Sequence, residues 1–73
     1  MSAQAVIDNE RMVHKANQIA AFFEPYPEEK AVAEVLGHLQ RFWPPAMRQQ
    51  LQDYVQTDGS GLHELVLKAA RQL

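Results

Sequence analysis

The sequence contains no cysteine, and its seven lysine and arginine residues are scattered along a chain of 73 residues. Without cysteine the chain forms no disulfide bonds, and its composition gives no reason to place it in an oxidising compartment. A formal net charge of −2 and the lack of a basic cluster argue against binding to nucleic acid. No apolar run reaches the roughly 18 residues of a membrane helix, and the first residues lack the basic and apolar regions of a signal peptide. We therefore expect a soluble cytoplasmic protein without a nucleic-acid or membrane partner.

The length allows one small domain with a modest core. We expect residues 8–73 to form this domain and residues 1–7, which lack apolar periodicity, to be disordered. A domain of this size has an expected free energy of unfolding of about 3–5 kcal/mol. Small domains commonly gain further stability from disulfides, a metal ion or a partner, and the missing cysteines exclude the first of these.

Four segments carry apolar residues at helical spacing, and proline or glycine separates them. No segment shows the apolar–polar alternation of a strand over a useful length. The sequence therefore predicts an all-α fold, a small compact bundle of about four short helices. The expected helices cover about residues 9–23, a segment from Pro27 or Glu28 to the Pro44–Pro45 pair, about residues 46–56 and about residues 62–72.

Local signals place the helix ends. Asp8 or Asn9 is expected to cap the first helix, and Glu24 before Pro25 ends it, because a proline disfavours the helical conformation of the preceding residue. Before the last helix, Gly59 is a plausible left-handed stop and Ser60 a plausible cap.

Phe22 and Phe23 cannot face the same way on a helix, because neighbouring side chains diverge by about 100°. Phe23 belongs to the apolar stripe of the first helix. Phe22 points to the polar side, which also carries Lys15 and Gln18. Two interpretations stay open for it: the ring tucks under the turn at residues 25–27, or it contacts another protein.

The segment "RFWPP" at the end of the second helix also allows two interpretations. Phe42 and Trp43 are large enough to close the bottom of the core. Tryptophan and arginine are also typical anchors of protein interfaces, so Arg41, Trp43 and Arg48 with the two prolines could form a docking edge.

Residues able to support chemistry are few. His14, His38 and His63 lie on three different predicted helices, and none has a second histidine one turn away, whereas metal sites need three or four ligands. Glu34 and His38 are one turn apart, but a solvated helix face explains them. The glycines at 59–61 precede a helix and could meet an anion, although a plain loop and cap explains them as well. We therefore expect no catalytic, cofactor-binding or metal-binding residue in this chain.

Three fragments, "MVHKANQIAAFFEPYP", "HLQRFWPPAMRQQL" and "GSGLHELVLKAARQL", follow one another within roughly residues 10–73. In this order and spacing they resemble the delta subunit of NAD-dependent formate dehydrogenase. The resemblance implies a non-catalytic accessory subunit that binds the large alpha subunit of a cytoplasmic enzyme and supports assembly, cofactor maturation or stability. It also implies that the parent complex holds a molybdopterin cofactor with molybdenum or tungsten, iron–sulfur clusters, FMN and NAD, none of them in this chain.

Two alternatives stay open: a maturation chaperone that binds the molybdenum cofactor or a guanine nucleotide directly, and a helical domain that associates weakly with itself. If the chain binds the alpha subunit, the first interface candidates lie on the polar side of the first helix and in the turn after it. They are Asn17, Gln18, Phe22 and Tyr26. The second candidates are Arg41, Trp43 and Arg48. For Asn17, a bond to a loop within the domain is the other interpretation.

Overall fold

The computed structural model describes residues 7–73, which form four helices and no strand. This result confirms the all-α prediction. The expected disorder of residues 1–6 falls outside the described residues, whereas Ile7 packs against the core and its carbonyl accepts a hydrogen bond from Gln50. The helices are α1 (Asn9–Phe23), α2 (Glu28–Phe42), α3 (Pro45–Thr57) and α4 (Glu64–Ala70).

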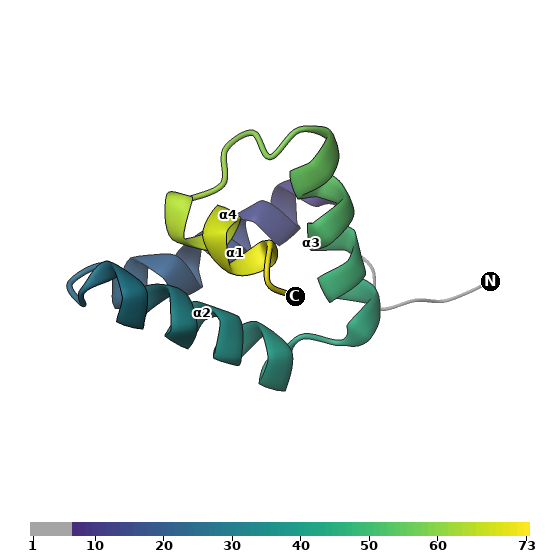
Figure 1. The fold of residues 1–73 in the computed structure, drawn as a ribbon. Helices are drawn as coiled ribbons and strands as arrows, with labels where there is room; N and C mark the ends of the chain where they lie inside the picture. The colour runs from purple at the N-terminus through teal and green to yellow at the C-terminus, as the bar shows by residue number, and fades with distance from the viewer. Residues whose placement is uncertain (1–6) are drawn as a thin grey trace.

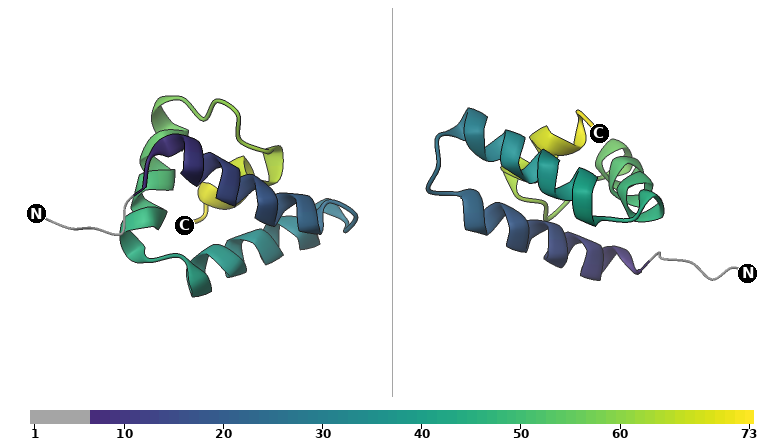
Figure 2. Two further views of the ribbon diagram at one scale, coloured as in Figure 1. Left: turned by 180° about the vertical axis from the view of Figure 1, so that it is seen from behind. Right: turned by 90° about the horizontal axis from the view of Figure 1, so that it is seen from below.

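The first two helices form an antiparallel hairpin (Figure 2). As predicted, α1 begins after Asp8, whose side chain accepts a hydrogen bond of 2.8 Å from the backbone N–H of Arg11. The helix ends at Phe23, where Pro25 follows. In Figure 1, α3 lies across the open end of the hairpin, and the short α4 lies against α2 in the middle of the molecule.

All four helices contribute to one core. Its largest fully buried side chains are Met12 on α1, Val35 and Leu39 on α2, Leu51 on α3 and Val66 on α4. Each helix buries its apolar stripe against the other three in this single core.

At the end of α2, Phe42 and Trp43 differ in burial, although one interpretation of the sequence places both rings in the core. Trp43 has an extended conformation (φ −87°, ψ 135°) and its side chain is 8% exposed. Phe42, the last helical residue, is 65% exposed. The prediction that both rings close the core is therefore correct for Trp43 and wrong for Phe42, because the chain leaves the helix between them and turns only Trp43 inward.

The start of α4 differs from the prediction. The helix begins at Glu64 rather than Leu62, and its cap is His63 rather than Ser60. Gly59 has the expected left-handed conformation (φ 72°), but Gly61 has one too (φ 83°), and this second positive φ keeps the helix from starting earlier. The His63 Nδ1 atom accepts a hydrogen bond of 3.0 Å from the Leu65 N–H.

His63 also joins α4 to the end of α1. Because Nδ1 accepts, the neutral ring carries its proton on Nε2, and Nε2 lies 2.7 Å from the Glu24 carboxylate. His63→Ala is expected to lower the free energy of unfolding by about 1 kcal/mol, as the loss of a helix cap does. His63→Asn keeps an acceptor for the cap and should recover most of that loss in urea unfolding. Equal losses in the two variants would contradict a capping role.

Candidate functional site

Three large apolar side chains are exposed on the described surface: Phe22 at 71%, Phe42 at 65% and Tyr26 at 41%. The Phe22 ring meets the Phe23 ring edge to face, with centroids 5.0 Å apart, and Phe23 in turn meets Tyr26 at 5.7 Å. With 71% of its surface exposed, Phe22 does not tuck under the turn at residues 25–27. Its exposed ring instead packs against the half-buried ring of Phe23.

Phe22 forms one end of an open hollow between the first two helices. This α1–α2 groove has a volume of about 520 Å³. Four lining residues repeat at helical spacing along two turns of α1. The other side is formed by His38 of α2 and by Trp43, which directly follows α2. The lining residues are Lys15, Gln18, Ile19, Phe22, Phe23, His38 and Trp43.

The predicted residues Gln18, Phe22 and Trp43 therefore meet in one place, but Lys15, Ile19 and His38 were not predicted to join them. The spacing i, i+3, i+4, i+7 of the α1 residues signals that they share a face. No comparable signal in the sequence identifies His38, because its position depends on how α2 packs against α1.

Beyond the groove, the surface continues along α2. The His38 ring lies 4.7 Å from the ring of Phe42, centroid to centroid, and the Arg41 guanidinium carbon lies 5.8 Å from the same ring. Arg41 and Phe42 are both exposed and stand beside the groove without lining it. Tyr26 extends the other end, where the Lys30 ammonium lies 5.9 Å from its ring centroid.

Asn17 is engaged within the chain. Its Nδ2 atom donates a hydrogen bond of 2.8 Å to the carbonyl of Gly61, and its Oδ1 atom accepts one of 2.8 Å from the N–H of His63. Of the two interpretations of this residue, the structure therefore supports the bond to a loop within the domain. Both ends of the amide are used, so Asn17 fastens the loop before α4 to the middle of α1.

The residues of the predicted docking edge have different roles in the structure. Arg48 donates hydrogen bonds from Nη1 to the carbonyls of Gln40 (2.9 Å) and Trp43 (3.1 Å), and so satisfies backbone acceptors at the end of α2. Of the side chains of Arg41, Trp43 and Arg48, only that of Arg41 is exposed and available to a partner. Trp43 packs in the core, and Arg48 bonds to the backbone.

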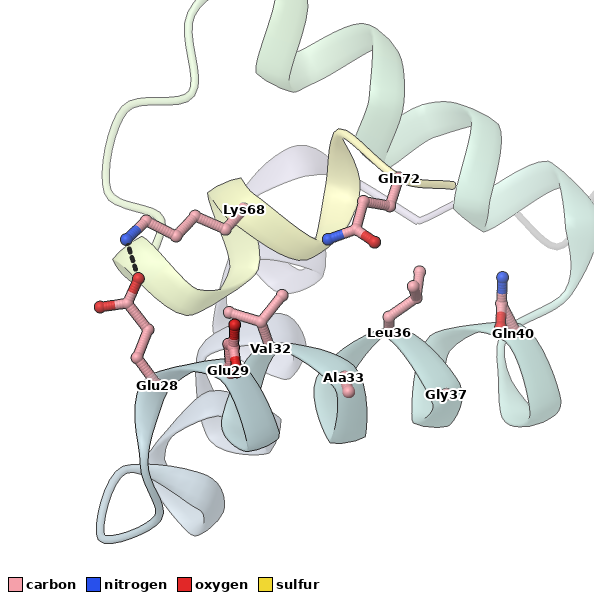
Figure 3. A pocket seen from close by; sticks show the side chains of 9 residues that line it. All are labelled: Glu28, Glu29, Val32, Ala33, Leu36, Gly37, Gln40, Lys68 and Gln72. Carbon is pink, nitrogen blue, oxygen red and sulfur yellow. Dashed lines mark hydrogen bonds and ion pairs between the residues drawn. The ribbon is translucent and has the colours of Figure 1, made fainter.

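A second hollow, of about 540 Å³, lies between α2 and α4 (Figure 3). Its lining combines the apolar Val32 and Leu36 with carboxylates at one end. There Lys68 pairs with Glu28, and its ammonium also lies 3.7 Å from Glu64. The hydrogen bond and the charge of Glu28 raise the pKa of Lys68 above its usual value. The ammonium that lines this hollow is thus already paired with carboxylates of the chain.

Several backbone N–H groups at the glycine loop and the start of α4 are bonded within the chain. The N–H of Leu62 donates to the carbonyl of Gly59, the N–H of His63 to Asn17, and the N–H of Leu65 to the His63 ring. Three backbone donors that an anion would need are therefore already used. Within residues 7–73, no group of three or more histidine, aspartate or glutamate side chains is placed to hold a metal ion. In the same range no helix has the length and apolarity needed to cross a membrane.

A sequence profile for the NADH-dependent formate dehydrogenase delta subunit, FdsD, matches residues 11–70. The chain belongs to this family. Comparison with curated proteins and with solved structures gave no match. The range matched by the delta-subunit family includes nearly all of α1, the whole of the other three helices and every residue that lines the α1–α2 groove. Family membership and the resemblance of the three sequence fragments thus agree.

Proposed function

We propose that this chain is a non-catalytic accessory subunit of a cytoplasmic NAD-dependent formate dehydrogenase, which binds the large alpha subunit and supports its assembly, cofactor maturation or stability. The match to the delta-subunit family over residues 11–70 carries the proposal. The exposed rings of Phe22 and Tyr26 support it, because exposed aromatic residues are typical anchors of protein interfaces. Gln18 and Arg41 border the same surface, and we include them in the proposed interface.

The chemistry of the chain fits an accessory role. Iron–sulfur clusters are held mainly by cysteine thiolates, and the chain has no cysteine. His63 uses one ring nitrogen to cap α4 and the other to contact Glu24. We assign the molybdopterin cofactor, the iron–sulfur clusters, FMN and NAD to the other subunits of the complex.

Direct binding of the molybdenum cofactor or a guanine nucleotide has less support. Phosphate groups favour clustered cations and free backbone N–H groups. The loop before α4 uses several of its N–H groups internally, and Arg48 bonds to carbonyls at the end of α2. We expect no binding heat when a guanine nucleotide is titrated into the chain, and a saturable heat with a stoichiometry of one would reverse this choice.

Co-purification tests the proposal directly. The tagged chain is expressed with the other subunits of its formate dehydrogenase, and the retained proteins and metal are quantified. We expect the alpha subunit to be recovered. Stoichiometric recovery with the metal-loaded enzyme would indicate a permanent subunit, and recovery with cofactor-free alpha subunit alone would indicate a maturation factor. Recovery of none of the subunits would contradict the proposal.

A further inference from the structure

We infer that the α1–α2 groove binds an amphipathic helix of another formate dehydrogenase subunit, and that this helix carries a carboxylate next to its apolar face. The inference rests on the proposed function and adds to it the surface used and the chemistry of the partner. It is drawn from the shape of the groove, the hydrogen-bonding state of its walls and its charge.

The walls of the groove favour an occupant whose backbone N–H and C=O groups are hydrogen-bonded within the occupant itself. Both walls are helices, and their backbone N–H and C=O groups are bonded along each helix. A strand or an irregular segment would bury unpaired backbone groups there, because the described residues include no sheet edge with which it could pair. A helix carries its backbone bonds within itself, and so it can present only side chains to the groove.

The shape of the groove also suits a helix. Its α1 wall repeats along two turns, at positions 15, 18, 19 and 22, and side chains at such spacing form the ridges between which a second helix packs. Ile19 and Trp43 supply an apolar floor. Phe22 stands 71% exposed at one end, where a partner would bury it. Burial of this one ring would remove the most exposed large apolar side chain of the described surface.

The charge of the groove specifies the partner further. Its lining contains Lys15 and His38 but no carboxylate, although the chain as a whole has a net charge of −2. Among the described residues Lys15 takes part in no ion pair, whereas Lys68 in the α2–α4 hollow is paired with Glu28 and Glu64. An approaching helix would partly desolvate the Lys15 ammonium, so a carboxylate on that helix is the complementary group.

The test compares matched pairs of variants of the full chain. Phe22→Ala removes the exposed phenylalanine of the groove, and Leu36→Ala removes an apolar side chain of the separate α2–α4 hollow. Lys15→Glu and Arg71→Glu each reverse one exposed charge, inside and outside the groove. The dissociation constant of each variant is measured against the remaining subunits, purified as a complex without this chain, and circular dichroism confirms that each variant is folded.

We expect Phe22→Ala and Lys15→Glu to weaken binding at least about tenfold, and the two controls to change it no more than about threefold. If the unaltered chain binds and all four variants bind equally well, the groove is not the interface, although the proposed function stands. If the unaltered chain does not bind, the proposed function itself fails.

A photo-crosslinking residue at position 18 then identifies the occupant within the assembled complex. We expect a crosslink to a helical peptide of another subunit that has aspartate or glutamate within one turn of the crosslinked residue. A crosslink to a second copy of this chain, or to a segment without a carboxylate, would overturn the inference. The same residue at position 56, an exposed position of α3, serves as the control.

Discussion

Replacing Trp43 with alanine is expected to leave a large fraction of the protein unfolded at 25 °C. The indole is 8% exposed and forms the floor of the α1–α2 groove as well as part of the core. Truncation of a buried tryptophan costs about 3–5 kcal/mol, because transfer energy is lost and a cavity remains. A core in a chain of this length supplies a total of about 3–5 kcal/mol. The loss is therefore comparable to the whole free energy of unfolding.

Phe42→Ala is the matched control, because it truncates the adjacent aromatic residue, which is 65% exposed. This variant should stay within about 1 kcal/mol of the unaltered chain. Urea unfolding followed by far-ultraviolet circular dichroism measures both, since the signal does not depend on the single tryptophan. If the two variants lose equal stability, Trp43 is not the core residue that its burial indicates.

These two neighbours also mark how far local sequence signals determine the fold. The bounds of α1 follow from a cap at Asp8 and a proline at position 25, both within two residues of the helix ends, and the prediction for this helix is correct. Helical spacing alone could not separate Phe42 from Trp43, because the change of backbone direction after residue 42 decides which ring turns inward. Similarly, the start of α4 was misplaced because Gly61 adopts a positive φ in a loop fixed by residues far away.

For the candidate site, the sequence predicts the outward direction of Phe22 but not which polar side chains form hydrogen bonds within the chain. The divergence of neighbours on a helix was sufficient to direct Phe22 away from the core. The roles of Asn17 and Arg48 could not be predicted, because their partners are determined by tertiary packing: Asn17 bonds to residues 44 and 46 positions away, and Arg48 to the end of another helix. A polar side chain that completes the fold and one that awaits a partner look alike in a sequence.

Replacing Asn17 with alanine is expected to lower the free energy of unfolding by about 2 kcal/mol. The change leaves the Gly61 carbonyl and the His63 N–H without their partners. The bond to the exposed Gly61 carbonyl contributes about 0.5–1.5 kcal/mol, and the partly buried His63 N–H costs about 1–3 kcal/mol when it is left unpaired. Alanine recovers about 0.5 kcal/mol, because it favours the helix more than asparagine does. Hydrogen exchange should accelerate at His63 and through α4, since the loop that positions this helix is released from α1.

Asn17→Asp separates the two bonds. Aspartate keeps an oxygen that accepts from the His63 N–H, but it has no N–H to donate to the Gly61 carbonyl, and so the loss should be smaller than in Asn17→Ala. Gln18→Ala removes the exposed neighbour and should change stability by no more than about 0.5 kcal/mol. If Asn17→Ala were as stable as Gln18→Ala but failed to bind the other subunits, Asn17 would serve the interface rather than the loop. If the loss of stability is largest for Asn17→Ala, smaller for Asn17→Asp and smallest for Gln18→Ala, Asn17 acts on the fold by fastening the loop before α4 to α1.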